Sequence, residues 1–81
     1  VIDEVVFKRI DIRLAALLLR LKQEQGRRVS ATQQDLANEL GSVREVVSRQ
    51  LQEFRRRGWV ELGRGWIEIQ LSDDLENLAR Q

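Results

Sequence analysis

Residues 32–58 read TQQDLANELGSVREVVSRQLQEFRRRG, and their pattern predicts two helices separated by a glycine turn. Thr32 can cap the first helix, because Asp35 three residues later can complete a capping box and suits the positive end of the helix dipole. Gly41 would end this helix, since glycine adopts the left-handed conformation of a helix C-terminus without strain. The apolar side of the helix would consist of Leu36, Ala37 and Leu40.

A second and longer helix is predicted from Val43 to about Arg57. Ser42 would cap it, with Glu45 as the partner in a second capping box, and Gly58 would stop it. At about 100° per residue its side chains divide into a polar and an apolar face. The polar face would consist of Arg44, Glu45, Ser48, Arg49, Gln52, Arg55 and Arg56. The apolar face would consist of Val43, Val46, Val47, Leu51 and Phe54.

Upstream of this stretch, leucines recur at helical spacing and predict a well-buried helix that ends at Gln25. This helix would begin at about Asp3 or at Asp11, because Val1–Ile10 can either continue the helix or form an incoming linker. Arg27–Ser30 would be a short strand or an extended lead-in to the next helix. The leucines that define the periodicity are Leu14, Leu17, Leu18 and Leu21.

Downstream of Gly58 the apolar period changes to two, which predicts a β-hairpin. Its strands would be Trp59–Leu62 and Trp66–Ile69, joined by the turn Gly63-Arg64-Gly65. Ser72–Glu76 would then open a short acidic helix. We therefore predict an α+β fold that is mostly α: a winged helix-turn-helix with a three-helix core, a β-hairpin wing and a short C-terminal helix.

The composition is that of one small globular domain. The chain has 81 residues, of which 42% are hydrophobic and 33% charged, and it has neither Cys nor His. Disulfides and thiolate ligands are thereby excluded, and the commonest general base and metal ligand are missing. The formal net charge is only +1, but residues 44–57 carry five arginines against two glutamates, and residues 68–81 carry four acids against one arginine. This asymmetry suits a protein with one phosphate-facing side.

The longest apolar run, Leu14–Leu19, has six residues, far fewer than the roughly 20 that span a bilayer. We therefore expect no membrane partner. The chain starts at Val1 rather than Met, and we expect it to be a fragment of a longer protein.

A short helix, a glycine turn and a longer helix form the arrangement in which the second helix lies in the DNA major groove. Arginine can donate two hydrogen bonds to guanine, and glutamate can accept one from cytosine, so polar residues in its first turns are predicted to read bases. These base-reading residues are Arg44, Glu45, Ser48 and Arg49. Thr32 and Ser42 at the two helix starts, and Arg64 at the hairpin turn, are predicted to contact phosphates.

Structural roles for the same residues stay open. Arginines and glutamates on an exposed helix usually only keep it hydrated, and Glu45 and Arg49 have the spacing of a favourable ion pair one turn apart. Arg55–Arg57 would first of all complement the helix dipole, with phosphate contact as a secondary role. Trp59 and Trp66 would pack on the hairpin and the core rather than stack on bases.

DNA binding has two alternatives, a protein-binding module and an enzyme. The main alternative is a winged-helix module for protein–protein contacts, because fold does not determine function. The polar and basic face of the second helix argues against it. An enzyme has little support, since the chain lacks His, Cys and a glycine-rich phosphate loop, and we expect no catalytic residues and no metal site.

The run TQQDLAxxLGxVREVVSRxL at residues 32–51 resembles the helix-turn-helix signature of the Crp/Fnr family of bacterial transcription regulators. The resemblance extends over most of the chain, from about residue 7 onward. Also similar to this family are Arg13–Leu19 ahead of the signature and, after it, Gly58, Val60 and Gly63–Gly65.

This resemblance implies that residues 11–81 are a C-terminal DNA-binding domain and that residues 1–10 are the end of a dimerisation helix or a linker. An effector-sensing β-roll domain would lie upstream, so this chain would hold no cofactor of its own. The implied partners are double-stranded DNA, a second copy of the full-length protein and RNA polymerase, all in the cytoplasm.

The base-reading positions carry over residue by residue. Arg44, Glu45 and Arg49 match those of the catabolite-activator branch of the family, and Glu45, Ser48 and Arg49 match those of the Fnr-like branch. A half-site that contains TGA is implied, with Glu45 and Arg49 at its G·C pair and Arg44 at a second guanine.

The resemblance also bears on phosphate contacts. Thr32 and Gln34 match phosphate-contacting positions. Val43 and Val46, by contrast, stand where the catabolite-activator branch has polar residues.

Overall fold

The computed structural model describes the backbone of residues 2–81 and the side chains of residues 10–81. In this part of the chain the elements follow one another as α1 (Ile2–Gln25), β1 (Arg28–Ser30), α2 (Gln33–Leu40), α3 (Arg44–Arg56), β2 (Val60–Gly63), β3 (Trp66–Ile69) and α4 (Ser72–Ala79). The strands form one antiparallel sheet in the order β1-β3-β2. The predicted winged helix-turn-helix fold is confirmed, with α2 and α3 as the helix pair and the β2–β3 hairpin as the wing.

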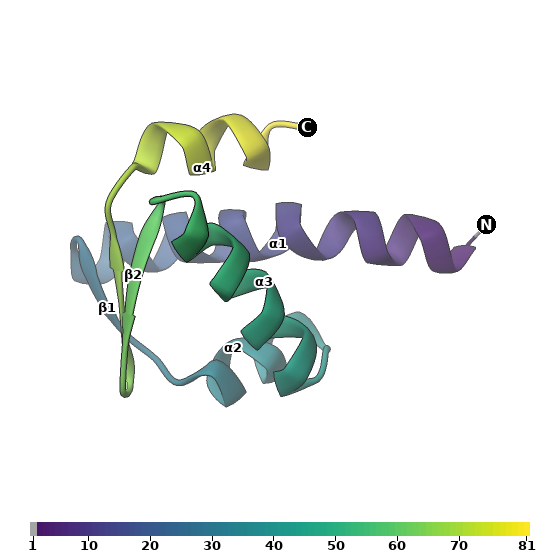
Figure 1. Ribbon diagram of the computed structural model, residues 1–81, viewed down its shortest axis with the longest axis horizontal. Helices are drawn as coiled ribbons and strands as arrows, with labels where there is room; N and C mark the ends of the chain where they lie inside the picture. Colours follow the sequence, from purple (N-terminus) through teal and green to yellow (C-terminus); the bar gives the residue numbers. More distant parts are fainter. Residues whose placement is uncertain (1) are drawn as a thin grey trace.

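α1 is the longest element and forms one side of the domain. It runs from Ile2 to Gln25 with no break at Asp11. α4 lies alongside α1 in Figure 1, and α1 also packs against β1 and α2. The assignment of residues 1–10 to the end of a dimerisation helix stays a prediction, because Val1 and the side chains of residues 2–9 lie outside the described part.

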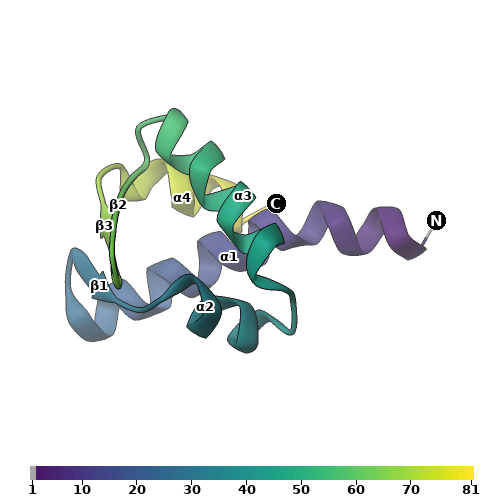
Figure 2. The ribbon, with the colours of Figure 1, turned by 60° about the horizontal axis from the view of Figure 1, so that its bottom comes forward.

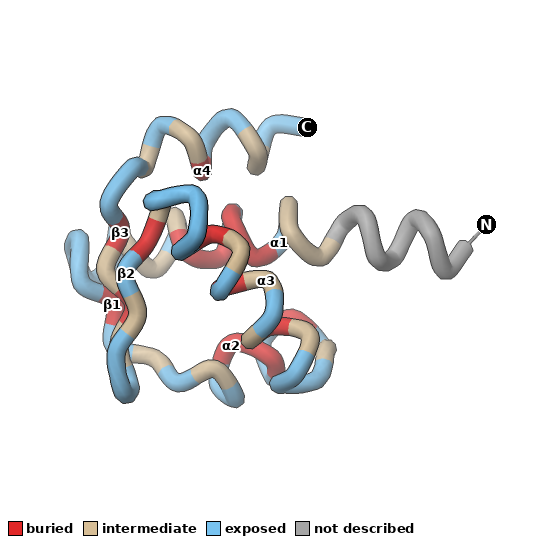
Figure 3. Tube along the Cα trace, viewed as in Figure 1, coloured by how far each residue is buried: buried red, intermediate tan, exposed pale blue. Residues whose placement is uncertain are grey.

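The core is formed where the helices and the inner face of the sheet meet, as the red segments of Figure 3 show. Each element contributes its apolar side, and no polar or charged residue among the described side chains is buried. Apolar packing therefore holds α3 on the domain and leaves its other face in solvent. The buried residues are Leu14, Ala15, Leu17, Leu18, Val29, Leu36, Ala37, Leu40, Val47, Leu51, Phe54, Val60, Ile67, Ile69 and Leu75.

β1 is a strand rather than an extended lead-in, because it pairs with the wing. Val29 lies opposite Ile67, and both are buried. The amide of Ala31 donates a hydrogen bond of 3.1 Å to the carbonyl of Gly65 at the hairpin turn. Gly65 has a φ of 79°, which only glycine adopts readily. The wing is thus attached to the body of the domain along β1.

Both tryptophans pack against other side chains, as predicted. The Trp66 ring covers Gly63 so closely that a Cβ atom at position 63 would overlap the ring. The guanidinium carbon of Arg28 lies 4.1 Å from the centroid of the Trp66 ring. Trp59 packs against Phe54, with 5.4 Å between the ring centroids. Trp66 thus packs on the hairpin, between Gly63 and Arg28, and Trp59 packs on the core at Phe54.

The start of α2 has the predicted capping box. The amide of Asp35 donates to Thr32 Oγ1, and the amide of Thr32 donates to Asp35 Oδ2, both at 3.0 Å. The bond from the backbone N–H of Thr32, together with the bond from its side chain, lowers the pKa of the Asp35 carboxyl. Gly41, with a φ of 66°, ends α2 in the left-handed conformation.

The start of α3 differs from the prediction. Its N-cap is Val43, with φ −109° and ψ 152°, and none of the described side chains caps this helix. The amide of Ser42 instead donates to the carbonyl of Ala37 at 2.9 Å and so closes the end of α2. The predicted capping box of Ser42 and Glu45 is therefore wrong, since Ser42 belongs to the turn.

Val43 does not lie on the buried face of α3 either, because 61% of its surface is exposed. Its backbone is extended rather than helical, so the angular spacing of a helix does not apply to its side chain. Val46 is half-buried, and the apolar face proper begins at Val47.

The arginines at the end of α3 pair with carboxylates, which confirms their predicted role as a helix-end cluster. Glu53 Oε2 lies 2.6 Å from Arg56 Nη2 and 2.8 Å from Arg57 Nε. Arg55 Nε lies 3.2 Å from Glu61 Oε1 on β2. These contacts connect the end of α3 to the root of the wing.

The Glu53 cluster predicts a pH-dependent contribution to stability. Hydrogen bonds from Arg56 and then Arg57 lower the pKa of Glu53 from 4.5 to about 2. Because the pKa is lower in the folded state, the stabilisation is complete above pH 4.5 and is lost as the pH falls towards about 2. We expect Glu53→Gln to lower the Tm at pH 7, and the difference to disappear near pH 2.

Thermal unfolding followed by circular dichroism at several pH values checks this expectation. Gln52→Ala is the matched control, because it alters a neighbouring exposed side chain without removing a charge. A Tm difference for Glu53→Gln that is the same at pH 2 and pH 7 would contradict a role for the ionised carboxylate.

Candidate nucleic-acid interface

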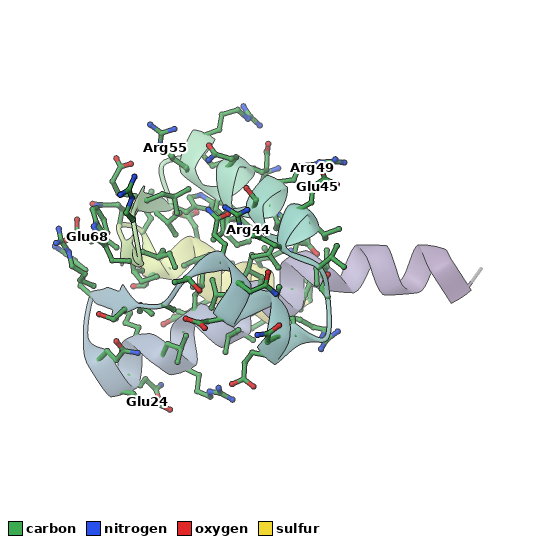
Figure 4. The ribbon with its side chains drawn as sticks, turned by 90° about the horizontal axis from the view of Figure 1, so that it is seen from below. Glu24, Arg44, Glu45, Arg49, Arg55 and Glu68 are labelled. Carbon is green, nitrogen blue, oxygen red and sulfur yellow. The ribbon has the colours of Figure 1, made fainter. Side chains whose placement is uncertain are left out.

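The first turns of α3 carry a polar surface, called here the α3 patch. Its members are adjacent or four positions apart in the sequence, and they share one face because a turn of an α-helix contains 3.6 residues. Figure 4 shows three of the four members together on the first part of α3, with Arg55 farther along the same helix. The α3 patch consists of Arg44, Glu45, Ser48 and Arg49, which line one shallow hollow. The structure thus brings together the four residues predicted to read bases.

The side chains of the α3 patch are free to bind a ligand. Among the described residues 10–81, none of the four makes a hydrogen bond or an ion pair within the protein. The ion pair predicted between Glu45 and Arg49 is therefore not formed. The contrast with Glu53, which binds two arginines farther along the same helix, shows that the patch is not merely an ion-paired helix surface.

A groove between the wing and the two helix starts lies beside the α3 patch. Figure 2 turns this side of the domain toward the reader. Arg44 lines both the groove and the α3 patch, and it therefore connects the two surfaces. The groove is lined by Ala31, Thr32, Gln33, Gln34, Arg44, Leu62, Gly63, Arg64, Gly65, Trp66 and Ile67.

Three of the four residues predicted to contact phosphates line this groove: Thr32, Gln34 and Arg64. The Thr32 hydroxyl oxygen accepts the bond from the Asp35 amide that caps α2. Gln34 Nε2 donates to Asn38 Oδ1 at 3.0 Å and retains a second N–H. Ser42 does not line the groove, and its amide is used in the turn.

Sequence reasoning missed two features of this surface. The position of Arg44 between groove and patch depends on the wing, which no local pattern places. The exposure of Val43 could be predicted from the sequence, because the amide of the residue after a left-handed glycine donates a hydrogen bond back to the preceding helix. Ser42 follows Gly41, so the next N-cap falls one position later, at Val43.

The arrangement is suited to a nucleic acid, which carries negative phosphates and presents hydrogen-bonding groups at the edges of its bases. Two arginines offer paired donors and Glu45 offers an acceptor at the start of one helix, and Arg64 lies at the tip of a wing beside it. Donors and an acceptor of this kind match guanine and cytosine edges in the major groove.

In the described part of the chain, no helix combines the length and the apolar character needed to cross a membrane.

Comparisons of the chain with a family model, a known protein and solved structures all point to the same family. Residues 12–78 match the family model described as the Crp-like helix-turn-helix domain. The transcriptional regulator SdrP of Thermus thermophilus is 35% identical in an alignment that covers 96% of this chain and 42% of that protein. A solved structure of a Crp/Fnr-family protein from Eubacterium rectale has a TM-score of 0.88 at 40% identity and covers 99% of this chain and 38% of its own.

The catabolite activator protein of Thermus thermophilus is a further structural relative, with a TM-score of 0.86 at 32% identity over 98% of this chain and 38% of its own. The chain thus spans about two fifths of the length of these relatives. The family match runs from α1 into α4 and includes both helices of the helix-turn-helix and the wing. The chain therefore belongs to the family of Crp-like helix-turn-helix domains.

Proposed function

We propose that this chain is the DNA-reading domain of a bacterial Crp/Fnr-type transcription regulator, and that α3 reads the major groove of a half-site containing TGA. One observation carries the proposal: four polar side chains are grouped at the start of α3 and have no partner within residues 10–81. A partner that covers these side chains removes water from their donors and acceptors. Binding is therefore favourable only if the partner supplies matching hydrogen-bonding groups.

The proposed contacts follow from the chemistry of each side chain. Arg49 donates to the guanine of the TGA half-site, and Glu45 accepts from the N4 amino group of the paired cytosine. Arg44 donates to a second guanine outside this pair, and Ser48 lies on the same face, one turn after Glu45. The G·C pair is thus recognised from both of its bases.

Phosphates on either side of the half-site would be held by the groove. Thr32, Gln34 and the amides at the start of α2 provide donors at the positive end of a helix dipole. Arg64 reaches the backbone from the wing tip, and Ser42 contacts it from the turn. Such contacts fix the position of the domain on DNA without reading sequence.

The rest of the regulator lies in the part of the protein that this chain does not span. We propose that the full-length protein is a homodimer, that it binds its effector outside this chain, and that RNA polymerase is a further partner. A dimer would present two copies of α3 about one helical turn of DNA apart, roughly 34 Å.

Binding of the chain to two short duplexes tests the proposal. One duplex contains TGA, and in the other the G·C pair of TGA is replaced by A·T. We expect the first to bind about 5- to 150-fold more tightly in fluorescence anisotropy titrations, because a good base contact contributes about 1–3 kcal/mol of discrimination. Equal and weak binding of both would instead support a protein-binding module.

Arg64→Ala should weaken binding without changing the base preference. Loss of one phosphate contact makes the negative slope of log K against log salt less steep by about 0.9. The affinity for both duplexes is therefore expected to fall by the same factor, and titrations between about 50 and 200 mM salt measure the slope. Arg80→Ala is the control, because Arg80 is the C-cap of α4, lies near Glu76 and does not line the groove. An unchanged slope for Arg64→Ala would exclude its phosphate contact.

A further inference from the structure

An exposed valine lies directly beside the α3 patch. Val43 is 61% exposed, and among residues 10–81 only Leu71, at 46%, is another large hydrophobic residue that is exposed. Val43 immediately precedes Arg44, the first member of the patch, and half-buried Val46 lies one turn further along. The polar patch therefore has an apolar border at the start of α3.

The fold does not explain why position 43 is a valine. Its side chain belongs to no buried cluster, so it contributes no core packing. It is the N-cap of α3, where its carbonyl accepts the amide of Val47 at 3.2 Å but its side chain makes no capping bond. Serine, threonine, aspartate and asparagine stabilise an N-cap, whereas valine is among the least favourable residues there. The valine is thus unfavourable for capping and unused in packing.

We infer that Val43 reads the C5-methyl group of a thymine in the half-site, with Val46 beside it. Thymine is the base with an apolar group in the major groove, and small apolar side chains recognise it by contact. The N-terminal residues of the second helix are those that reach base edges in this fold, and Val43 lies at that end. The inference rests on the proposed insertion of α3 into the major groove, and it adds a thymine to the bases read there.

A methyl deletion in the DNA, combined with a side-chain change in the protein, tests the contact. Each thymine of the TGA duplex is replaced in turn by deoxyuridine, which lacks the methyl group and keeps the base-pairing groups. We expect the affinity of the native chain to fall about fourfold at one position, as removal of one buried methyl group implies. In Val43→Ser the deoxyuridine at that position should cause no further loss.

Thermal unfolding separates this role from a structural one. Val43→Ser introduces a favourable N-cap at an exposed position, so its Tm should equal or exceed that of the native chain. Leu71→Ser is the matched control, because it removes the other exposed large hydrophobic residue, at the start of α4, and should respond to deoxyuridine as the native chain does.

The outcomes distinguish this inference from the proposed function. A chain that prefers the TGA duplex but shows no deoxyuridine effect that depends on Val43 would overturn the thymine contact and leave the function intact. A uniform loss of affinity in Val43→Ser, with the deoxyuridine effect unchanged, would place Val43 against the sugar-phosphate backbone and also overturn it. A chain without preference for the TGA duplex would overturn both proposals.

Discussion

Arg49→Ala is expected to abolish most of the preference for the TGA duplex over the duplex with A·T in place of the G·C pair. The guanidinium of Arg49 has no partner among residues 10–81, so its removal leaves no unpaired carboxylate behind and the fold is unaffected. The loss should amount to about 1–3 kcal/mol, a factor of about 5 to 150, and should appear in the affinity for the TGA duplex. Fluorescence anisotropy titrations with both duplexes measure it.

Glu45→Ala gives a second measurement on the same base pair. If Glu45 and Arg49 read the two bases of one G·C pair, the double variant should lose less discrimination than the sum of the single variants, because contacts that share one base pair as partner are coupled. Gln52→Ala is the control, since Gln52 is exposed on α3 beyond the patch and should retain the full preference. Native discrimination in both single variants would show that α3 reads DNA through other residues.

Phe54→Ala is expected to have the largest effect on stability. Phe54 is the largest of the fully buried side chains and joins α3 to the core, where it also contacts Trp59. Truncation of a buried phenylalanine costs about 3–5 kcal/mol, because transfer energy is lost and a cavity remains. A domain of this size has an unfolding free energy of roughly 4–12 kcal/mol, so the variant should be close to unfolding at room temperature. Its Tm should fall by about 15–30 °C.

Differential scanning calorimetry and chemical denaturation measure this loss. Gln52→Ala again serves as the control on the same helix, and its stability should remain within about 0.5 kcal/mol of the native value. DNA binding by Phe54→Ala should follow the folded fraction and retain the native base preference at low temperature. A Tm close to that of the native chain would mean that α3 is held mainly by contacts other than the core.

Much of this domain follows from local patterns in the sequence. The box of Thr32 and Asp35, the glycine after α2 and the change of period after Gly58 each act over a few residues, and the structure confirms each of them. The buried face of α3 from Val47 onward also follows, because helical spacing alone determines which side chains share a face. The grouping of the α3 patch has the same origin.

Other features depended on contacts between segments far apart in the chain. β1 is a strand because β3 pairs with it, and Arg44 joins groove and patch because the wing folds back beside the helix starts. The start of α3 was predicted wrongly because the turn after Gly41 uses the amide of Ser42. The ion pair of Glu45 with Arg49 was compatible with their spacing, but it is not among the ion pairs that residues 10–81 form.

The sequence alone therefore determined the order of the elements, the polar face of α3 and the family to which the chain belongs, because these properties reside in the spacing of residues along one segment. The tertiary structure decided that Val43 faces solvent and that the α3 patch, without a partner among residues 10–81, lies beside a groove formed by α2 and the wing. These properties arise where separate segments meet, since burial and pairing depend on which neighbours the completed fold supplies.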